Sequence, residues 1–260
     1  MIDDSPVSMT PVALVTGAAK RVGKVVAERL SAAGYRVVLH SNHSREEAEA
    51  VADRLRASGS EAAVVTADLS DEDQTRQMAA DAWQQFGRID ALVNCAAIWK
   101  PKPLEEVRAA DVLEHFTINT LGTFLCCQEI GLRMVEQESG GAIVTVGDWA
   151  IARPYIDYAA YFPSKGAIPT LTRMLAVELA RRNSRVRVNC ILPGPVLLPP
   201  GISAEAKRKV IDLTLVKREG SPEYVAHAVL FLLENDFVTG VTLPVDGGRS
   251  IFSGHFEHGS

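Results

Sequence analysis

The sequence predicts a single-domain α/β protein of the Rossmann type, built on a doubly wound parallel sheet with helices on both faces. Short apolar runs alternate with helical stretches along most of the 260 residues, a rhythm typical of βαβ units. The runs are apolar throughout, as expected for strands that are covered on both faces. Hydrophobic residues make up 47% of the chain and charged residues 23%, so a large core is expected. The length would allow two domains, but single-sheet α/β folds often use about 250 residues.

The strands are predicted from apolar runs that end in small or polar residues. They are expected at 12–16, 36–40, 62–66, 89–94, 142–146, 187–191 and 241–244. The stretches between them repeat apolar side chains every three or four residues, as helices do. Helices are expected from about 21, from the cap Ser44 to about 57, and at 71–86, 111–135, 161–182 and 222–234. Pro and Gly are concentrated at 193–201, which predicts a loop leading into a short helix at 203–213.

The chain divides into a core domain and two short ends. Residues 1–11 are polar and acidic, without a basic start or an apolar segment, so we expect a flexible leader and not a signal peptide. The catalytic domain is expected at 12–250, with a substrate lid at about 194–215, and residues 251–260 form a tail. No apolar run reaches the roughly 18 residues that cross a bilayer. A cytoplasmic location without membrane contact is therefore expected.

Charge and cysteine content exclude several classes of partner. The 27 basic and 32 acidic residues give a net charge of −5, and no Lys or Arg cluster suggests a nucleic-acid surface. The histidines lack metal-ligand spacing, so no metal site is predicted. Free thiols in apolar surroundings, without the spacing of a redox or zinc site, are expected at Cys95, Cys126, Cys127 and Cys190.

A glycine-containing turn follows the first strand and opens the first helix. Gly17 suits a tight turn and Gly23 suits close packing of the helix on the sheet. A helix N-terminus in this context offers N–H groups to the pyrophosphate of a dinucleotide. The alternative is an ordinary glycine turn between strand and helix.

The second strand ends without the acidic residue that normally selects NAD. That residue would bind the adenosine ribose 2′-hydroxyl, whereas residues 40–44 contain no carboxylate. With Lys20 and Arg21 expected on the same side, a 2′-phosphate would meet donors and no repelling charge. NADP(H) is therefore the predicted cofactor. Ser44 has a second possible role as a plain helix cap.

Tyr161 and Lys165 are four residues apart, which places them on one face of a helix, about 5–6 Å apart at Cβ. A neighbouring ammonium and a nicotinamide cation would lower the pKa of a phenol from about 10. The pair therefore suits proton transfer near neutral pH, although the spacing alone is common. Pro169 lies in the same helix, where it removes one hydrogen bond and is expected to disturb it.

Nearly the whole chain resembles the classical short-chain dehydrogenase/reductases. The matching positions are Gly17, Asp68 with Leu69, residues 94–97, Asn119, Tyr161 with Lys165, Pro193 with Gly194, and residues 244–248. The resemblance implies hydride transfer from a nicotinamide, with Tyr161 as proton donor and Lys165 on the nicotinamide ribose. It also implies that Asn119 keeps a water for a proton relay and that Asp68 bonds the adenine. Members often form tetramers, so a homotetramer is expected.

Departures from the common pattern look like those of the pteridine reductases and the bacterial dihydromonapterin reductases. Arg21 replaces the middle glycine of the turn, Asp148 stands where the family carries a catalytic serine, and Trp99 follows the fourth strand. In that subgroup the arginine approaches substrate and cofactor, the aspartate takes part in proton delivery, and the aromatic residue stacks on the pterin. Tyr158 also matches a tyrosine of the subgroup. Trp99 has the alternative of being an ordinary half-buried aromatic residue.

The chemistry of a carboxylate supports the same interpretation. A serine hydroxyl donates to a ketone oxygen as negative charge develops, whereas an ionised Asp148 only accepts and would repel that charge. A dihydropterin has N–H donors that suit a carboxylate, and its reducible C=N bond gains a proton on nitrogen. The alternative role for Asp148 is a cap near Trp149.

The predicted function is NADPH-dependent reduction of the C=N bond of a dihydropterin, such as dihydromonapterin, dihydrobiopterin or dihydrofolate. The alternatives are a carbonyl reductase acting on a ketoacyl or sugar-like ketone with Asp148 protonated, and a catalytically silent NADP-binding regulator. The expected catalytic residues are Asp148, Tyr161, Lys165 and Asn119. The expected substrate-binding residues are Arg21, Trp99, Asp148, Tyr158 and Tyr161. The expected cofactor-binding residues are Gly17, Lys20, Arg21, Val22, Gly23, His40, Ser41, Asn42, His43, Ser44, Asp68, Leu69, Asn94, Ala96, Tyr161, Lys165, Pro193 and Gly194.

Overall fold

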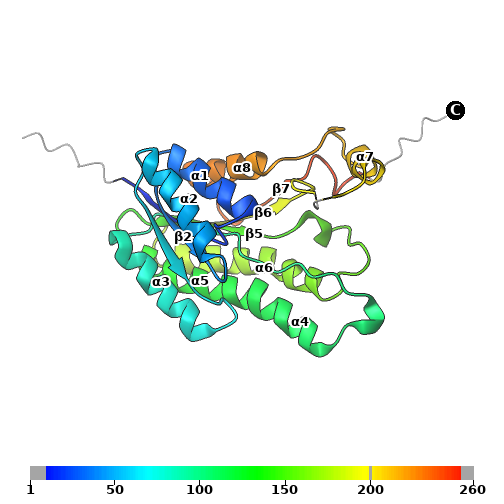
Figure 1. Ribbon diagram of the computed structural model, residues 1–260. Helices are drawn as coiled ribbons and strands as arrows, with labels where there is room; N and C mark the ends of the chain where they lie inside the picture. Colours follow the sequence, from blue (N-terminus) through cyan, green and yellow to red (C-terminus); the bar gives the residue numbers. More distant parts are fainter. Residues whose placement is uncertain (1–9, 199–200, 253–260) are drawn as a thin grey trace, which may run out of the picture.

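Seven parallel strands form one sheet in the part of the chain that the computed structural model describes, residues 10–198 and 201–252. Most of the predicted leader and tail lies outside these ranges. The strands are β1 (Val12–Thr16), β2 (Arg36–Ser41), β3 (Ala62–Thr66), β4 (Ala91–Asn94), β5 (Gly141–Val146), β6 (Val186–Pro193) and β7 (Thr242–Val245). Their order in the sheet is β3-β2-β1-β4-β5-β6-β7 (Figure 1). The predicted doubly wound sheet is confirmed.

The order of the strands reverses between β1 and β4. The chain builds β2 and β3 on one side of β1 and then returns to place β4 on the other side. Thr16, the last residue of β1, is in register with Asn94, the last residue of β4. Ligands of such sheets bind beyond the carboxyl ends of the strands at this reversal.

Two helical layers cover the sheet, as predicted (Figure 1). The layer on one face comprises α1 (Arg21–Ala32), α2 (Arg45–Ala57) and α8 (Pro222–Glu234), and the other comprises α3 (Glu72–Phe86), α5 (Gly122–Glu136) and α6 (Tyr161–Ala180). Side chains of β1 alternate between the layers, since Ala13 and Val15 pack on the first and Leu14 on the second. The helix α7 (Ala204–Asp212) lies outside both layers, over the carboxyl end of the sheet. Within the described ranges, no helix is long and apolar enough to cross a membrane.

The helix predicted at 111–135 is three segments in the structure. These are α4 (Ala109–His115), a π-helical segment from Phe116 to Leu121, and α5. Apolar periodicity is nearly the same in the two kinds of helix, which is why the sequence pattern did not separate them. π-Helical turns are frequent at functional sites, and this one contains Asn119.

The helix α6 runs through Pro169 without interruption. Pro169 has no N–H to donate to the carbonyl of Lys165, one turn earlier. The expected disturbance therefore does not divide the helix, and Tyr161 and Lys165 remain on its first turns. Short 3₁₀ turns complete the described elements at Leu104–Glu106 and Trp149–Ile151.

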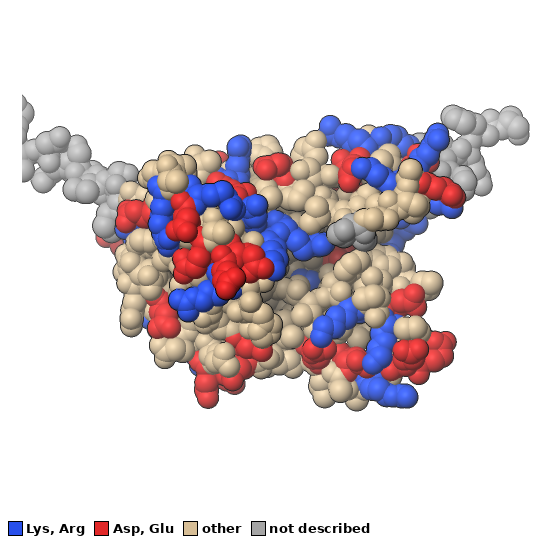
Figure 2. Space-filling model, in the orientation of Figure 1, with Lys and Arg blue, Asp and Glu red and all other residues tan. Residues whose placement is uncertain are grey.

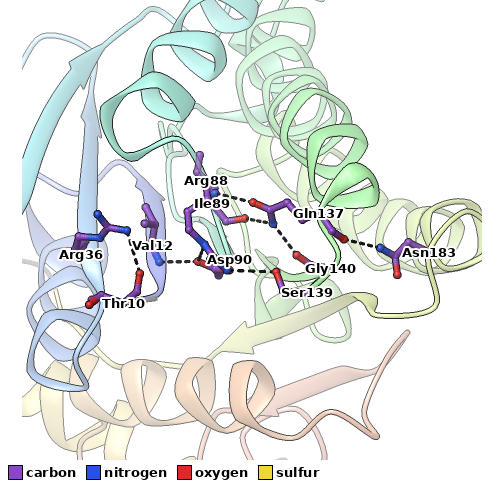
Figure 3. Close-up of polar contacts among 10 residues, drawn as sticks. All are labelled: Thr10, Val12, Arg36, Arg88, Ile89, Asp90, Gln137, Ser139, Gly140 and Asn183. Atoms are coloured by element: carbon purple, nitrogen blue, oxygen red, sulfur yellow. Dashed lines mark hydrogen bonds and ion pairs between the residues drawn. The ribbon is translucent and has the colours of Figure 1, made fainter. Parts of the chain in front are cut away.

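The amino ends of the strands are joined by a dense polar network (Figure 3). Asp90 accepts the Val12 N–H at 2.8 Å and a hydrogen bond from Arg88 Nε at 2.9 Å. The Gln137 amide accepts the Ile89 N–H at 3.3 Å and donates to the Ile89 carbonyl at 3.0 Å. This network fixes the starts of β1 and β4 relative to the end of α5.

Candidate active site

The turn after β1 has no room for side chains at two of its positions. Gly17 adopts φ +65°, and a Cβ there would lie 2.9 Å from the Ala96 Cα. A Cβ on Gly23 would collide with the carbonyl of Gly17. Lys20 precedes α1, and its side chain accepts no hydrogen bond from the first N–H groups of the helix. The turn thus fits the pyrophosphate of a dinucleotide, which needs close backbone approach and free N–H groups.

Arg21 occupies the turn in a strained conformation. Its φ of +53° lies in the left-handed region, where a glycine meets no penalty and an arginine does. Non-glycine residues held in this region are typical of functional sites. The Arg21 side chain is exposed, and the neighbouring Val22 packs partly against the core.

His40 lies behind the turn. Its ring is 1% exposed, its Nδ1 accepts the Gly17 N–H at 3.3 Å, and its Nε2 lies 3.2 Å from the Ala67 carbonyl. Burial lowers the pKa of His40 to about 4, so the ring is neutral. Ser41 is also buried. The buried His40 ring thus supports the turn from behind, and the Ser41 carbonyl accepts the Ala67 N–H at 3.2 Å. The predicted role of both residues in cofactor binding stays a prediction.

Four other predicted cofactor-binding residues form a rim, here called the exposed rim, in which Lys20, Asn42 and His43 are exposed and Ser44 is half-buried. Lys20 makes an ion pair of 2.6 Å with Glu47 of α2, and both side chains are about half exposed. Asn42 and His43 are exposed, and Ser44 precedes α2 without making a side-chain cap. The rim offers amide, imidazole, hydroxyl and ammonium groups, but Glu47 already neutralises part of the Lys20 charge.

Asp68 follows β3 at the same edge of the sheet. Its carboxylate accepts hydrogen bonds from the backbone and hydroxyl of Ser70, at 2.9 and 2.7 Å, and these bonds lower its pKa. The Asn42 side chain also contributes to the lowered pKa. The next residue, Leu69, is buried, and a Cβ on Gly122 of α5 would lie 2.8 Å from its carbonyl.

The residues after β4 contribute backbone more than side chains. The Asn94 amide points into the protein, where Nδ2 lies 3.2 Å from Cys127 Sγ and Oδ1 is buried without a partner among the described residues. The Ala96 N–H donates to Thr16 Oγ1 at 3.1 Å, which holds this loop against the end of β1. Ala96 therefore borders the turn, whereas the Asn94 side chain does not.

Asn119 ties three segments together. Its Oδ1 accepts the Ile98 N–H at 2.8 Å, and its Nδ2 donates to the Ile98 carbonyl at 3.1 Å and to Ser164 Oγ at 3.0 Å. The residue is fully buried in the π-helical segment. Its side chain thus fixes the loop after β4 against α6.

Asp148, Tyr161 and Lys165 meet beyond the end of β5. The Tyr161 hydroxyl donates to Asp148 Oδ2 at 2.9 Å, and Asp148 Oδ1 accepts the Ala150 N–H at 2.8 Å. The Lys165 ammonium donates to the carbonyl of Val146, the last residue of β5, at 2.8 Å. The predicted catalytic group is therefore assembled, with Asp148 bound to Tyr161 and also serving as the cap of the following turn.

Burial shifts the protonation equilibria of all three groups toward their neutral forms. The pKa of Asp148 is raised by burial, against the lowering effects of its hydrogen bonds and of Lys165. The pKa of Tyr161 is raised by burial and by the Asp148 charge, and that of Lys165 is lowered by burial. The Asp148 carboxylate thus opposes the expected lowering of the Tyr161 pKa.

Aromatic side chains form a wall beside this group. The Trp99 and Tyr158 rings are stacked, with centroids 4.8 Å apart and planes 13° apart. Tyr155 packs edge-on against Tyr158 at 5.1 Å and against Phe162 at 4.9 Å, and Trp149 lies 6.4 Å from Tyr155. The Trp99 side chain remains 41% exposed, so part of its surface is open to a ligand.

The segment predicted as a lid begins where β6 ends. Pro193 pairs in register with Val245, and the Gly194 N–H donates to the Val245 carbonyl at 2.9 Å. A cavity of about 400 Å³ lies beside this segment and is lined in part by Val196 and Gly247. Figure 2 shows that the face with this edge of the sheet is hollowed and that Lys and Arg side chains border the hollow.

Three residues of the site were not predicted from the sequence. Tyr155 and Trp149 complete the aromatic wall, and His115 packs edge-on against Tyr161 with ring centroids 6.2 Å apart. The Nε2 atom of His115 is buried without a partner among the described residues. The one sequence feature that could have pointed to Trp149 and Tyr155 is their position in the loop after the fifth predicted strand.

Comparison with known proteins gave a consistent picture. A protein-family model described as enoyl-(acyl carrier protein) reductase matches residues 17–250. A glucose 1-dehydrogenase of Gluconobacter oxydans is 32% identical over 252 residues, covering 94% of this chain and 93% of that protein. A 3-oxoacyl-[acyl-carrier-protein] reductase of Staphylococcus epidermidis is 31% identical over 244 residues, covering 92% and 99%.

Solved structures are similar over the same length. A blue fluorescent protein from a metagenomic library, crystallised in complex with NADPH, has a TM-score of 0.84 at 30% identity, covering 92% of this chain and 97% of that one. A short-chain dehydrogenase/reductase mutant of Serratia marcescens has a TM-score of 0.84 at 30% identity, covering 92% and 98%.

Proposed function

The chain belongs to the classical short-chain dehydrogenase/reductase family, and we propose that within it the protein reduces the C=N bond of a dihydropterin with NADPH. The observation that carries this substrate class is the hydrogen bond from Tyr161 to Asp148. Asp148 brings an acceptor to the place where a neutral hydroxyl donor is expected from the family pattern. We infer that the substrate presents nitrogen-bound hydrogens to this site.

NADP(H) is the cofactor. The turn at Gly17 and Gly23 fits its pyrophosphate, and the exposed rim at residues 42–44 holds donors without a carboxylate. A relative with a TM-score of 0.84 was crystallised with NADPH. When bound, the nicotinamide supplies the hydride. Lys165, which is 4% exposed and held at the end of β5, would bind the nicotinamide ribose.

Tyr161 delivers the proton that balances the hydride. The hydride adds to the carbon of the C=N bond and the phenolic proton goes to its nitrogen, so the tyrosine is left as a phenolate. The Lys165 ammonium stabilises that phenolate by its charge. Asp148 accepts an N–H or amino hydrogen of the ring and so orients the substrate, since an ionised carboxylate is acceptor-only.

The aromatic wall and the lid would hold the flat ring. Trp99 offers an exposed surface for stacking next to Tyr158, and aromatic pairs of this kind prefer offset or edge-on contact. We propose that the described parts of the predicted lid, residues 194–198 and 201–215, close over the ring. Closure would exclude water and strengthen the hydrogen bonds to Asp148.

Carbonyl reduction is the second candidate, and the names of the relatives favour it. These relatives include a 3-oxoacyl-[acyl-carrier-protein] reductase and a glucose 1-dehydrogenase. The raised pKa of Asp148 supports this candidate, because a protonated carboxyl group donates a hydrogen bond to a developing oxyanion. The two candidates therefore differ in the protonation state of Asp148 during turnover.

One assay separates the candidates. NADPH oxidation by the wild-type protein would be measured with dihydromonapterin, dihydrobiopterin and dihydrofolate, and with a 3-ketoacyl thioester and a sugar ketone. We expect kcat/KM to be highest for a dihydropterin. A higher value for a ketone would reject the dihydropterin proposal in favour of carbonyl reduction. Cofactor binding without turnover of any of these compounds would support a silent NADP-binding regulator.

We also propose that the protein is a homotetramer. Large apolar side chains are exposed along the outer surfaces of α5 and α6, among them Leu132, Met174 and Val177. Such residues usually lie in contacts between subunits when they are contiguous. Light scattering that gives the mass of a single chain would contradict this proposal.

A further inference from the structure

Two arginines lie together at the edge of the aromatic wall. The guanidinium carbon of Arg249 lies 5.0 Å from the centroid of the Trp149 ring. Arg153 follows in the same loop as Trp149, and its Nη1 donates to the Arg249 carbonyl at 3.3 Å. Trp149 follows Asp148 and lies 6.4 Å from Tyr155 of the aromatic wall, so the Arg249 guanidinium lies next to the proposed substrate site, and Arg153 is bound to the Arg249 backbone.

Among the described residues, neither charge is paired with an acidic side chain. Within residues 10–198 and 201–252, no carboxylate oxygen lies within 4.0 Å of Arg153 or Arg249. Their hydrogen bonds go to backbone carbonyls, including Arg249 Nη1 to Leu213 at 3.2 Å and Arg153 Nη1 to Phe252. Each guanidinium has five N–H donors, so these bonds leave donors on both side chains.

Holding the charges of Arg153 and Arg249 close together costs free energy unless an anion binds them. Both side chains are partly buried, and the pKa of Arg249 is lowered by burial and then by the charge of Arg153. Two like charges in a partly desolvated place destabilise a fold when no counter-ion is present. Ionisable groups held in this way are typical of binding sites.

Helix α7 of the predicted lid adds one positive charge that is unpaired among the described residues. Lys207 and Lys209 make ion pairs with Glu219 and Glu205, whereas the intervening Arg208 makes no ion pair with a described residue. Figure 2 shows Lys and Arg side chains over α7, although the chain as a whole has a net charge of −5. The helix ends one residue before Leu213, whose carbonyl binds Arg249.

We propose that Arg153 and Arg249 bind an anionic group, a carboxylate or a phosphate, at the end of the substrate farthest from the reducible bond. This inference rests on the proposed function, since it assigns the ring to the aromatic wall and the anionic group to the arginines. Guanidinium groups bind carboxylates and phosphates through paired hydrogen bonds, which suits them to this role. The preferred dihydropterin thus carries a negatively charged side chain.

Steady-state kinetics test the pair with two matched substrates. Dihydrofolate carries a glutamyl tail with two carboxylates, whereas dihydrobiopterin has the same kind of ring with a neutral side chain. We expect Arg249→Gln to lower kcat/KM for dihydrofolate by about 10–100-fold, mainly through KM, and to change that for dihydrobiopterin by less than about 3-fold. Arg249→Lys should recover part of the loss, and Arg173→Gln on the exposed surface of α6 is the control. Equal losses for both substrates would show a structural role and overturn the proposal.

Binding without turnover keeps the inference separate from the proposed reaction. Calorimetry on the NADP-bound protein would compare benzoylglutamate, phenyl phosphate and the neutral benzamide. We expect one of the two anions to bind at least about 10-fold tighter than benzamide, and which of the two does so identifies the natural group. Arg153→Gln and Arg249→Gln should each remove this preference, with melting temperatures confirming that both variants fold. If no dihydropterin is reduced but the preference is present, the proposed reaction fails and the anion site stands. If benzamide binds as well as both anions, or if the variants keep the preference, the anion site is rejected.

Discussion

The two ends of the sheet differ in how completely their buried polar groups are hydrogen-bonded. At the amino ends, Asp90 and Gln137 join β1, β4 and α5 through bonds that pair each of their side-chain groups (Figure 3). At the carboxyl ends, two buried polar groups have few partners among the described residues. Asn94 Oδ1 has none, and the Lys165 ammonium donates only to the carbonyl of Val146. Arg21 holds a left-handed backbone conformation at the same end. The difference suggests a division of labour: hydrogen bonds at the amino ends stabilise the fold, and the residues proposed for the reaction lie at the carboxyl ends, which we call the reactive end.

The largest effect is expected at the reactive end. Tyr161→Phe removes the transferable proton and the hydrogen bond to Asp148, so we expect kcat to fall by about 10²–10⁴-fold while NADPH still binds. Stopped-flow fluorescence of bound NADPH and steady-state assays would measure the two quantities. Tyr35→Phe, which removes a phenolic hydroxyl far from the site, is the control. Near-normal turnover of the Tyr161 variant would show that another group is the donor.

A substitution in the polar network at the amino ends of the strands should lower the stability of the fold and leave the catalytic rate unchanged. Asp90→Ala leaves the Val12 N–H and the Arg88 guanidinium without their acceptor in a place where Asp90 is 16% exposed. We expect the free energy of unfolding to fall by about 2–3 kcal/mol, with kcat unchanged. Urea unfolding would measure the loss, and Asp53→Ala, at an exposed ion pair, should cost less than about 0.5 kcal/mol. A loss of kcat with intact stability would remove the proposed division between the ends.

The stability of the fold should depend on pH through His40, which lies behind the turn after β1. Its pKa is lowered from 6.5 to about 4 by burial, so its contribution to stability is complete above pH 6.5 and is lost as the pH falls toward 4. At pH 5 the contribution of this residue should be smaller than at pH 7.5 by about 2 kcal/mol. Urea unfolding of wild type and His40→Gln at both pH values would show a smaller pH dependence in the variant. Equal dependence in the two proteins would mean that His40 titrates normally.

The smallest effect concerns the exposed rim. We expect kcat/KM for NADPH to exceed that for NADH by about 10-fold or more, since residues 42–44 offer donors to a 2′-phosphate and Glu47 is already paired with Lys20. Asn42→Asp should reduce this ratio, because the new carboxylate repels the phosphate. A preference for NADH in the wild type would contradict the cofactor assignment.

The fold could be predicted because its strands are buried on both faces. The structure has β1, β3 and α8 within the predicted bounds, and glycines or caps mark the turns beside them. The start of β4 was predicted two residues too early, since the Asp90 side chain replaces a strand bond there. Apolar patterns predict burial well, but they do not show which groups accept or donate the backbone hydrogen bonds at the end of a strand.

The site could be predicted only in part, and for a related reason. Helical spacing related Tyr161 to Lys165, and the end of a strand together with the family resemblance pointed to Asp148. The structure brings these three residues together. The burial of His40 was missed, because a strand covered on both faces gives no sign of which residues stay inside at its end. The contact of Arg249 with Trp149 joins residues 100 positions apart in irregular segments, where no periodicity exists.

The central claim is that Asp148 selects a substrate with nitrogen-bound hydrogens, and Asp148→Ser tests it most directly. The serine restores a neutral donor while Tyr161 and Lys165 stay in place. Steady-state kinetics of wild type and variant on one dihydropterin and one activated ketone should show dihydropterin reduction falling by about 10–1,000-fold and ketone reduction rising. Full dihydropterin activity in the variant, or a wild type that prefers the ketone, would contradict the account and support carbonyl reduction.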